Sequence, residues 1–331
     1  MADRQEEKLE YLPEEAVFRR NAFILITTMV DLSNQTPQDT SMLVEEVLHT
    51  LFFLGVINCP PFSPQSLLDD DDEILDYLKK EYPLPFQLYL TQLPRMSPFS
   101  CLLDMVVSLY GQENEDQIKD KLKKIVDKMK KDPTSNKKEE SSKKKKERKP
   151  KIFFSSTICI SRINISSSCI YYGVSMSTKG RPAGEILVAS SCFSFWHRLV
   201  SDAVMTYYPD KQKKSYFSRN IKIPTDIKCE AFNISEGRPM DPCTSCSDLF
   251  GLDTNECRRW AHGSCAEVES LSNLFKGEQH VMEGLGPDEN EQEGRLRAEK
   301  RVLKHLKKQL KIFKDFNWDG RFYPNLNPNT N

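Results

Sequence analysis

The segment 132–150 constrains the fold most, because it is rich in lysine and carries no aliphatic or aromatic side chain. Such a segment has no apolar surface to bury and is expected to form a charged, flexible linker. The 331 residues are enough for about two domains of roughly 150 residues each. We therefore expect a helical domain at 1–112, a basic helix and flexible linker at 113–150, an α/β domain at 151–276, and an acidic loop, basic amphipathic helix and tail at 277–331.

The first part of the chain has apolar residues at the spacing of amphipathic helices, with prolines between the helical runs. The acidic run Asp69–Asp72 favours a helix start, because carboxylates stabilise a helix N-terminus. We find no catalytic constellation in this part, and we expect His49 to lie on a helix surface. The expected helices cover residues 18–32, 42–52, 74–78 and 102–110.

The pattern changes after the linker. Residues 152–165 and 168–177 are rich in Ile, Phe, Tyr and Ser with partial alternation, which predicts a hairpin that turns near residues 164–167. The apolar spacing over 185–208 predicts one long helix, and residues 227–234 predict a third strand. Strands followed by a helix, a strand and a helix-rich segment indicate an α/β sandwich.

Charge is balanced overall but unevenly placed. Lys and Arg number 47, Asp and Glu number 48, and the net charge is -1. The run Lys143–Lys146 and the basic residues around an apolar stripe at 296–313 can contact nucleic acid or an acidic partner, and the run can also act in nuclear import. The alternative is a solvated linker and a docked helix whose cations face water.

No apolar run approaches the roughly 20 residues of a membrane-spanning helix. The first residues also lack the apolar core of a secretion signal. We therefore expect no membrane partner and a cytoplasmic or nuclear location. Thiols stay reduced there, so the 10 cysteines are not expected to form a disulfide framework.

Four of these cysteines lie within residues 243–265. Cys243 and Cys246 have the Cys-x-x-Cys spacing that brings two sulfurs to one ion, and thiolates suit Zn²⁺. Three thiolates, with Cys265 as the third, would leave the fourth position of a zinc ion to water. Glu267, two residues beyond Cys265, can reach that water without binding the metal.

Residues 265–267, Cys-Ala-Glu, resemble a motif of the cytidine deaminase superfamily, and residues 242–246 resemble its Pro-Cys-x-x-Cys motif. The resemblance covers about residues 151–276 and implies a three-layer sandwich. It implies a zinc-dependent hydrolytic deaminase that acts on a nucleobase, in a nucleoside or a nucleic acid, with Glu267 as general acid and base. The two motifs stand in reversed order here, so the metal elements are permuted, the fold is a divergent relative, or the match is accidental.

A second interpretation is a closed structural zinc site of three cysteines and a histidine, which are Cys243, Cys246, Cys257 and His262. Cys265 is then a spare ligand, and Glu267 and Glu269 are ordinary exposed helix residues. The protein would be a non-catalytic scaffold that binds a protein partner through its helical domain. A third interpretation has no metal and four reduced cysteines. In the deaminase interpretation, Trp260 and His262 flank the site and either contact the base or serve packing.

Overall fold

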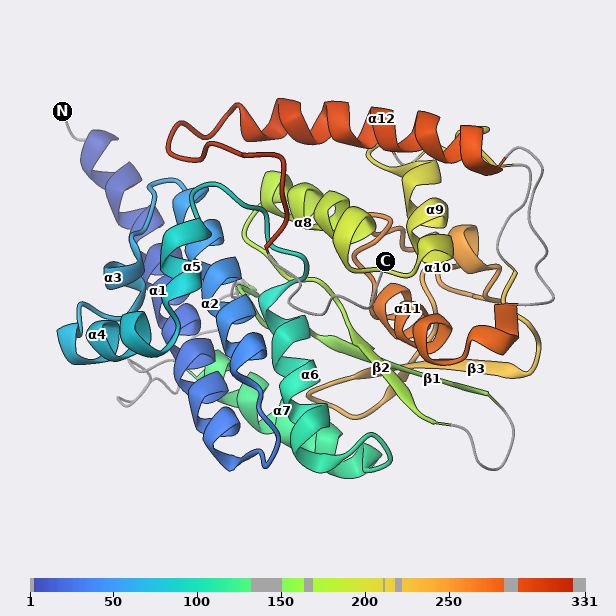
Figure 1. The fold of residues 1–331 in the computed structure, drawn as a ribbon, viewed down its shortest axis with the longest axis horizontal. Helices are drawn as coiled ribbons and strands as arrows, with labels where there is room; N and C mark the ends of the chain where they lie inside the picture. The colour runs from blue at the N-terminus through green and yellow to red at the C-terminus, as the bar shows by residue number, and fades with distance from the viewer. Residues whose placement is uncertain are drawn as a thin grey trace.

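The structure, a computed structural model, describes residues 3–131, 151–163, 169–210, 212–217, 222–282 and 291–323. Within these ranges it contains twelve α-helices, one 3₁₀ helix and a four-stranded antiparallel sheet (Figure 1). This mixture of helix and sheet agrees with the expected α/β class, and the three-layer sandwich stays a prediction. None of the helices in the described ranges combines the length and the apolar character that crossing a membrane requires.

Parts of the chain for which the sequence makes specific predictions lie outside the described residues. They are the expected linker at 132–150, the hairpin turn at 164–167 and residues 283–290 of the expected acidic loop.

Seven helices form the N-terminal half, and capping explains where several of them begin. The side chains of Ser63, Asp71 and Ser97 accept hydrogen bonds from backbone N–H groups in the first turns of α3, α4 and α6. The helix expected after the acidic run is therefore confirmed as α4. The helices are α1 (Asp3–Gln35), α2 (Ser41–Val56), α3 (Pro64–Leu67), α4 (Asp72–Glu81), α5 (Pro83–Leu88), α6 (Pro98–Tyr110) and α7 (Glu115–Lys130).

The expectation that His49 lies on a helix surface is wrong. Every residue of α2 from Glu46 to Val56 is buried, so this helix has no solvent face there. The His49 ring packs against the ring of Tyr323, with centroids 4.1 Å apart. Burial lowers the pKa of His49 to about 3, so the ring stays neutral. The covering residue comes from the other end of the chain, which helical periodicity cannot reveal.

The remaining elements follow residue 150. They are β1 (Thr157–Ile163), β2 (Tyr171–Val174), α8 (Arg181–Ser194), α9 (Arg198–Tyr207), β3 (Ile227–Asn233), β4 (Pro239–Met240), α10 (Thr244–Phe250), α11 (Ala266–Gly277), η1 (Gln279–Met282) and α12 (Glu291–Leu310).

The sheet has the strand order β2-β1-β3-β4, with every neighbouring pair antiparallel. Ile158 of β1 lies opposite Val174 of β2 and Phe232 of β3. The third strand is confirmed, and the first two are shorter than expected. Helix α11 packs against the sheet so closely that a Cβ at Gly173 would lie 2.2 Å from the backbone nitrogen of Ser270. Glycine in β2 therefore sets how near α11 can approach.

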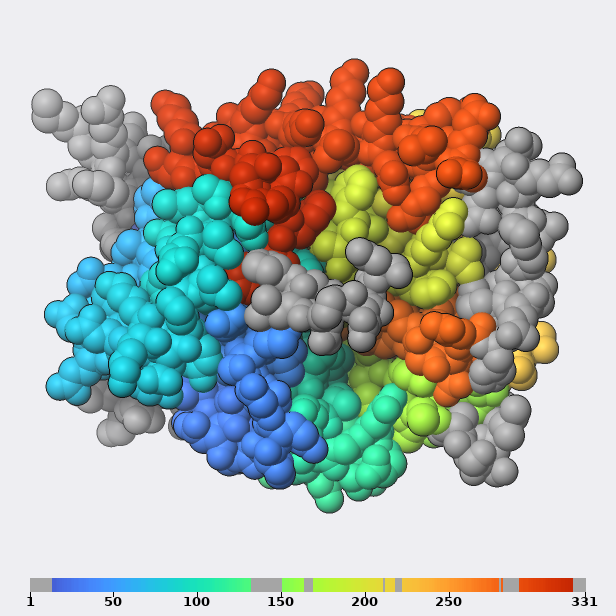
Figure 2. All heavy atoms as spheres, in the orientation of Figure 1, coloured from blue at the N-terminus to red at the C-terminus, as the bar shows by residue number. Residues whose placement is uncertain are grey.

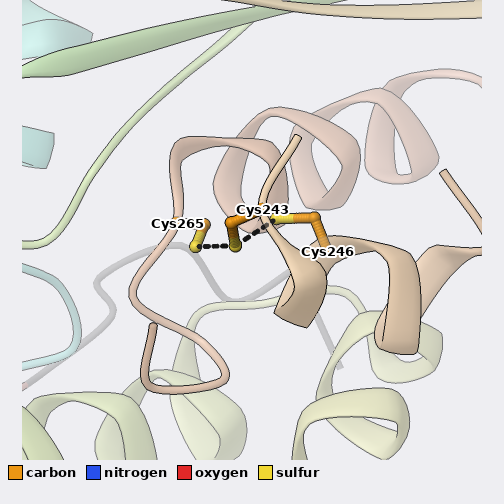
Figure 3. A group of neighbouring side chains, drawn as sticks. All are labelled: Cys243, Cys246 and Cys265. Carbon is orange, nitrogen blue, oxygen red and sulfur yellow. Dashed lines mark hydrogen bonds between the residues drawn. The ribbon is translucent and has the colours of Figure 1, made fainter. Parts of the chain in front are cut away.

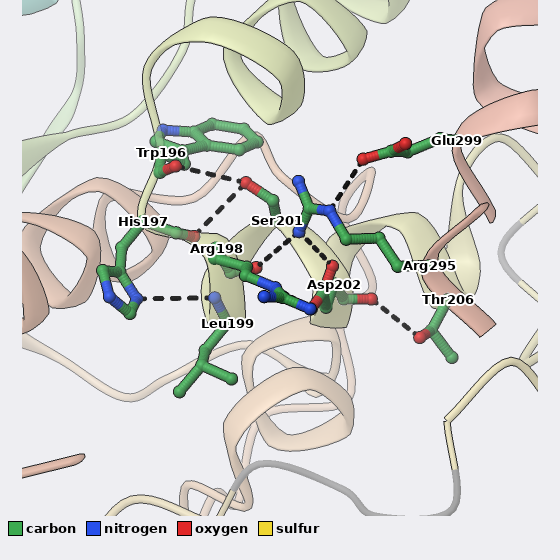
Figure 4. Close-up of polar contacts among 9 residues, drawn as sticks. All are labelled: Trp196, His197, Arg198, Leu199, Ser201, Asp202, Thr206, Arg295 and Glu299. Carbon is green, nitrogen blue, oxygen red and sulfur yellow. Dashed lines mark hydrogen bonds and ion pairs between the residues drawn. The ribbon is translucent and has the colours of Figure 1, made fainter. Parts of the chain in front are cut away.

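The expected long helix over 185–208 is two helices, α8 and α9, that are separated at residues 195–197. Figure 4 shows the ring of His197 capping α9, where its Nδ1 accepts a hydrogen bond from the backbone N–H of Leu199 at 3.4 Å. The backbone N–H of His197 donates to Ser272 Oγ of α11 at 2.8 Å. A contact with a distant helix thus supports the break, which the continuous apolar spacing does not reveal.

Helix α12 docks on α8 and α9 (Figure 1). Its buried apolar residues form one stripe, which consists of Ala298, Val302, Leu306 and Leu310. Arg295 fixes the start of the helix, because its guanidinium donates to Asp202 of α9 at 2.6 Å and to Glu299 at 2.7 Å (Figure 4). The expected basic amphipathic helix is therefore present, but Leu296, where the expected apolar stripe begins, is 61% exposed.

The two halves of the chain share one hydrophobic core. Asn21 of α1 donates to the carbonyl of Ile152 at 2.8 Å across a buried contact. Beyond α12 the chain returns to the N-terminal helices, where the ring of Phe316 lies 4.9 Å from that of Phe53. Figure 2 shows this C-terminal segment against the N-terminal helices on one face of the molecule.

Trypsin is expected to cut first within 132–150, where lysines are dense and no apolar side chain opposes exposure. Because the two halves share a core, we expect the two fragments to stay associated after this cut. Brief digestion, gel filtration and denaturing electrophoresis should give two bands that co-elute at the size of the intact chain. Separate elution, or a first cut within residues 151–276, would count against this prediction.

Candidate metal centre

Three cysteines meet where two helices begin (Figure 3). Cys243 is the residue that precedes α10, Cys246 lies in the first turn of that helix, and Cys265 precedes α11. Cys243 and Cys265 both have extended backbone, which turns the chain into the helix that follows. Residues that are 22 positions apart in the chain therefore present their sulfurs to the same point.

The sulfur positions fit a metal ion. Cys243 Sγ lies 3.7 Å from Cys246 Sγ and 3.3 Å from Cys265 Sγ. Tetrahedral ligation with Zn–S bonds of about 2.3 Å places sulfurs about 3.8 Å apart. All three sulfurs lie within 4.8 Å of one another, and no fourth His, Cys, Asp or Glu of the described residues joins the group. Three protein ligands with one position left open is the ligand count of a catalytic rather than a closed site.

The three thiols polarise one another. Hydrogen bonds with Cys246 and Cys265 lower the pKa of Cys243, and the same contacts with Cys243 raise the pKa of Cys246 and Cys265. One thiolate shared among three sulfurs is therefore favoured near neutral pH. Since a metal ion binds thiolates, binding would release the remaining thiol protons.

Glu267 lies beside this group and outside it. The residue is 5% exposed, and Cys243 and Cys246 both influence the pKa of its carboxyl. Burial raises the pKa of Glu267 to about 7, against a smaller lowering by its own backbone N–H and by Cys246. The structure thus places a buried carboxyl near the cysteine group.

The residues of the closed site are not brought together. Cys257 is exposed and does not belong to the group. His262 is engaged elsewhere, because its Nε2 lies 3.1 Å from an Asp248 carboxylate oxygen and its ring stacks on Tyr207 at 4.3 Å. In the described residues the sequence-based ligand set of Cys257 and His262 is therefore not assembled.

A cavity of about 840 Å³ lies on the side of Ser264, and the three cysteines and Glu267 are not among its described lining residues. Ser264, the neighbour of Cys265, lines it together with His262. Aromatic side chains from separate parts of the chain form its walls, among them Tyr207 from α9 and Trp260, which is 56% exposed. The sequence pattern did not single out Tyr207 as a cavity residue, because its apolar spacing on a helix is also that of a core residue.

Glu269 is not the exposed helix residue that the closed-site interpretation requires. It is 4% exposed, and it accepts a hydrogen bond from Ser100 Oγ of α6 at 2.8 Å. Its other oxygen, Oε1, has no hydrogen-bond partner among the described residues. Helix α11 has its first turn enclosed between the sheet and α6, so neither acidic residue of that turn faces water.

The contribution of Glu269 to stability should fall as the pH rises from about 5 to about 7.5. Burial raises the pKa of Glu269 to about 8, whereas the unfolded chain loses this proton near 4.5. Between these values the folded state binds more protons than the unfolded state, so a rise in pH lowers the free energy of unfolding. Asp104 and Glu267, with pKa values raised by burial to about 7, act with the same sign, and His49, with its pKa lowered by burial to about 3, acts with the opposite sign below about pH 6.5.

Thermal unfolding of the wild type and of Glu269→Gln across this range measures the effect. The variant cannot titrate at this position, so its melting temperature should fall less with rising pH than that of the wild type, and Asp104, Glu267 and His49 set the slope that remains. An equal dependence of melting temperature on pH for the two proteins would show that the pKa of Glu269 is the same in the folded and unfolded states. Lys276, whose pKa burial lowers to about 8, titrates mainly above this range.

The site therefore combines an open group of three thiols, a buried carboxyl and an aromatic cavity. Comparisons with protein-family models, with curated proteins and with solved structures found no match for this chain. A metal ion with one free position, next to a carboxyl that is not a ligand, can activate a water molecule for hydrolysis.

Proposed function

We propose that this protein is a zinc-dependent hydrolytic deaminase that acts on a nucleobase, in a nucleoside or a nucleic acid. The observation that carries the proposal is the meeting of three thiol ligands with the buried carboxyl of Glu267, close to an aromatic cavity. Zinc deaminases use this combination, with a Cys₃ or His-Cys-Cys ligand set and a glutamate that is not a ligand.

Each residue has a defined task. A zinc ion held by Cys243, Cys246 and Cys265 would lower the pKa of a water molecule at its free position. Glu267, in the first turn of α11, would accept one proton of the attacking water and pass it to the ring nitrogen, and would then pass the second proton of that water to the departing amine. Burial of this carboxyl keeps bulk water from competing for the proton.

The aromatic cavity supplies a binding place for a planar base. The face of Trp260 is open to solvent, and the stacked pair of Tyr207 and His262 lies in the same wall. Aromatic faces bind flat rings by stacking, which favours a base over an aliphatic amide as substrate.

The reversed motif order is compatible with this site. The sulfurs of Cys243 and Cys265 lie 3.3 Å apart because two helix starts converge. Metal binding depends on where the ligand atoms lie in space and not on the order of the two helices in the chain. The reversal therefore does not argue against the resemblance.

Ammonia release by the purified, zinc-loaded chain tests the proposal. Cytidine, deoxycytidine, adenosine, single-stranded DNA and RNA are offered as substrates, and the metal-stripped protein is the control. Metal-dependent release from any of them supports the proposal. If the zinc-loaded chain releases ammonia from none of these substrates, it is not a deaminase that acts on them.

A structural metal site in a non-catalytic scaffold is the second candidate, and the burial of two ligands favours it. Cys243 is 6% exposed and Cys246 is fully buried. An ion at this position would join α10 to the start of α11 and hold the segment between them in place. Such a scaffold would bind its protein partner through the helical half, and a cytoplasmic or nuclear location is expected for either candidate.

A further inference from the structure

The solvent face of α12 forms one wall of a basic groove. The apolar stripe of this helix is buried against α8 and α9, so the opposite face is held in a fixed position. A groove of about 820 Å³ runs between this face and residues 209–210. Six basic side chains line it, which are Lys300, Arg301, Lys304, Lys307, Lys308 and Lys311.

Little negative charge opposes these cations. The single carboxylate of the groove is Asp210, and it is already ion-paired with Arg301 and with Lys214. Among the described residues, no carboxylate forms an ion pair with Lys304, Lys307 or Lys308. The groove is therefore strongly positive in a chain whose net charge is -1.

The basic groove joins the aromatic cavity beside the metal centre. Pro209 and Asp210 line both hollows, so they form the edge that the two share. The ring of Tyr208 lies in the cavity wall and meets the ring of His305 of the groove edge-on at 5.5 Å. A ligand that lies along the lysines of α12 can therefore extend past Pro209 and Asp210 towards Trp260.

We infer that this continuous groove binds single-stranded nucleic acid, with phosphates along α12 and a base in the aromatic cavity. A positive groove next to exposed aromatic faces is the arrangement by which proteins hold single strands. A duplex keeps its bases paired and stacked, so it cannot place one in the cavity without extruding it. The link to catalysis rests on the proposed function; the binding itself does not.

Two other polyanionic partners fit less well. An acidic protein would pair its carboxylates with the lysines, but carboxylates do not stack on the exposed face of Trp260. A membrane surface is flat, and the apolar face that α12 would have to insert is buried in the core. Single-stranded nucleic acid alone uses both the charge and the aromatic rings.

Fluorescence anisotropy with labelled single-stranded DNA and RNA oligonucleotides tests the inference on the full-length chain. The triple variant Lys304→Glu, Lys307→Glu, Lys308→Glu should bind at least about tenfold more weakly than wild type. The slope of log affinity against log salt should fall by about 2, since each lost phosphate contact on a single strand removes about 0.7. The charge-matched control on the opposite side of the molecule in Figure 1 is α7, with its exposed residues Lys123, Lys124 and Lys128 changed to Glu.

Trp260→Ala separates stacking from charge. It should weaken binding about tenfold and leave the salt slope unchanged, because stacking on an aromatic side chain involves no counterion release. Unchanged binding by both the α12 triple variant and Trp260→Ala would overturn the inference. Competition by poly-glutamate as effective as that by the oligonucleotide would overturn it too, and would point to an acidic protein partner.

The binding and activity measurements distinguish failure of this inference from failure of the proposed function. A chain that binds the oligonucleotide through α12 and releases no ammonia supports this inference and contradicts the proposed function. A chain that deaminates free nucleosides and binds no oligonucleotide supports the proposed function and overturns the inference. Thermal unfolding of every variant checks that the fold is intact.

Discussion

Serine in place of Cys243, Cys246 or Cys265 should reduce the zinc content of the purified chain from about one ion per chain to almost none. Each variant leaves only two thiolates, and two ligands do not hold zinc against exchange with water and buffer. The three sulfurs lie within 4.8 Å of one another, so we expect each to contribute similarly to zinc affinity. Elemental analysis of the wild type and the variants measures the result.

Cys257→Ser is the matched control, because it makes the same chemical change at an exposed cysteine of the same segment. It should retain the full zinc content. His262→Ala should retain it too, because the His262 ring is hydrogen-bonded to Asp248 and not to the cysteine group. The closed structural site predicts the reverse pattern. Loss of zinc in Cys257→Ser together with retention in Cys265→Ser would refute the metal centre described above.

Glu267→Gln should keep its zinc and lose deaminase activity by about 10²- to 10⁴-fold, the usual cost of removing a general acid or base. The amide has nearly the shape of the carboxyl, so packing at the start of α11 is preserved. It cannot accept and return a proton, however, so proton transfer by this side chain is lost. Ammonia release and zinc content are measured on the same samples.

Glu269→Gln is the control for this variant. Glu269 is buried on the same helix, and its pKa of about 8 keeps it mainly protonated near neutral pH, so glutamine is a close substitute. Zinc content and activity should both stay near the wild-type values. Full activity in Glu267→Gln would show that the proton is moved by another group, even if the reaction class holds.

Several features follow from local sequence because their causes are local. Helix α4 begins where Asp71 can accept hydrogen bonds from the backbone N–H groups of Glu73 and Ile74. Strand β3 follows from a short run of strand-forming residues. The cysteine group was predicted correctly as close neighbours, since a Cys-x-x-Cys pair and one further cysteine stand near two expected helix starts.

The roles of other residues depended on contacts that are far away in the chain. Glu269 is buried because α6 closes over α11, and Ser100 of α6 is 169 positions away. The expected long helix is divided near His197, where Ser272 of α11 accepts its backbone hydrogen bond. In both cases the local sequence pattern was compatible with more than one structure, and contacts with a distant helix decided which one forms.

The sequence by itself identified three cysteines and a glutamate as candidate site residues, and it left a catalytic site, a closed structural site and a metal-free cluster open. Only the tertiary structure decided that Cys257 and His262 stay outside the group, and that α12 joins its lysines to an aromatic cavity. The physical reason is that ligand type and helix capping act over a few residues. Burial, charge proximity and cavity walls are set by segments that meet only after the shared core has formed.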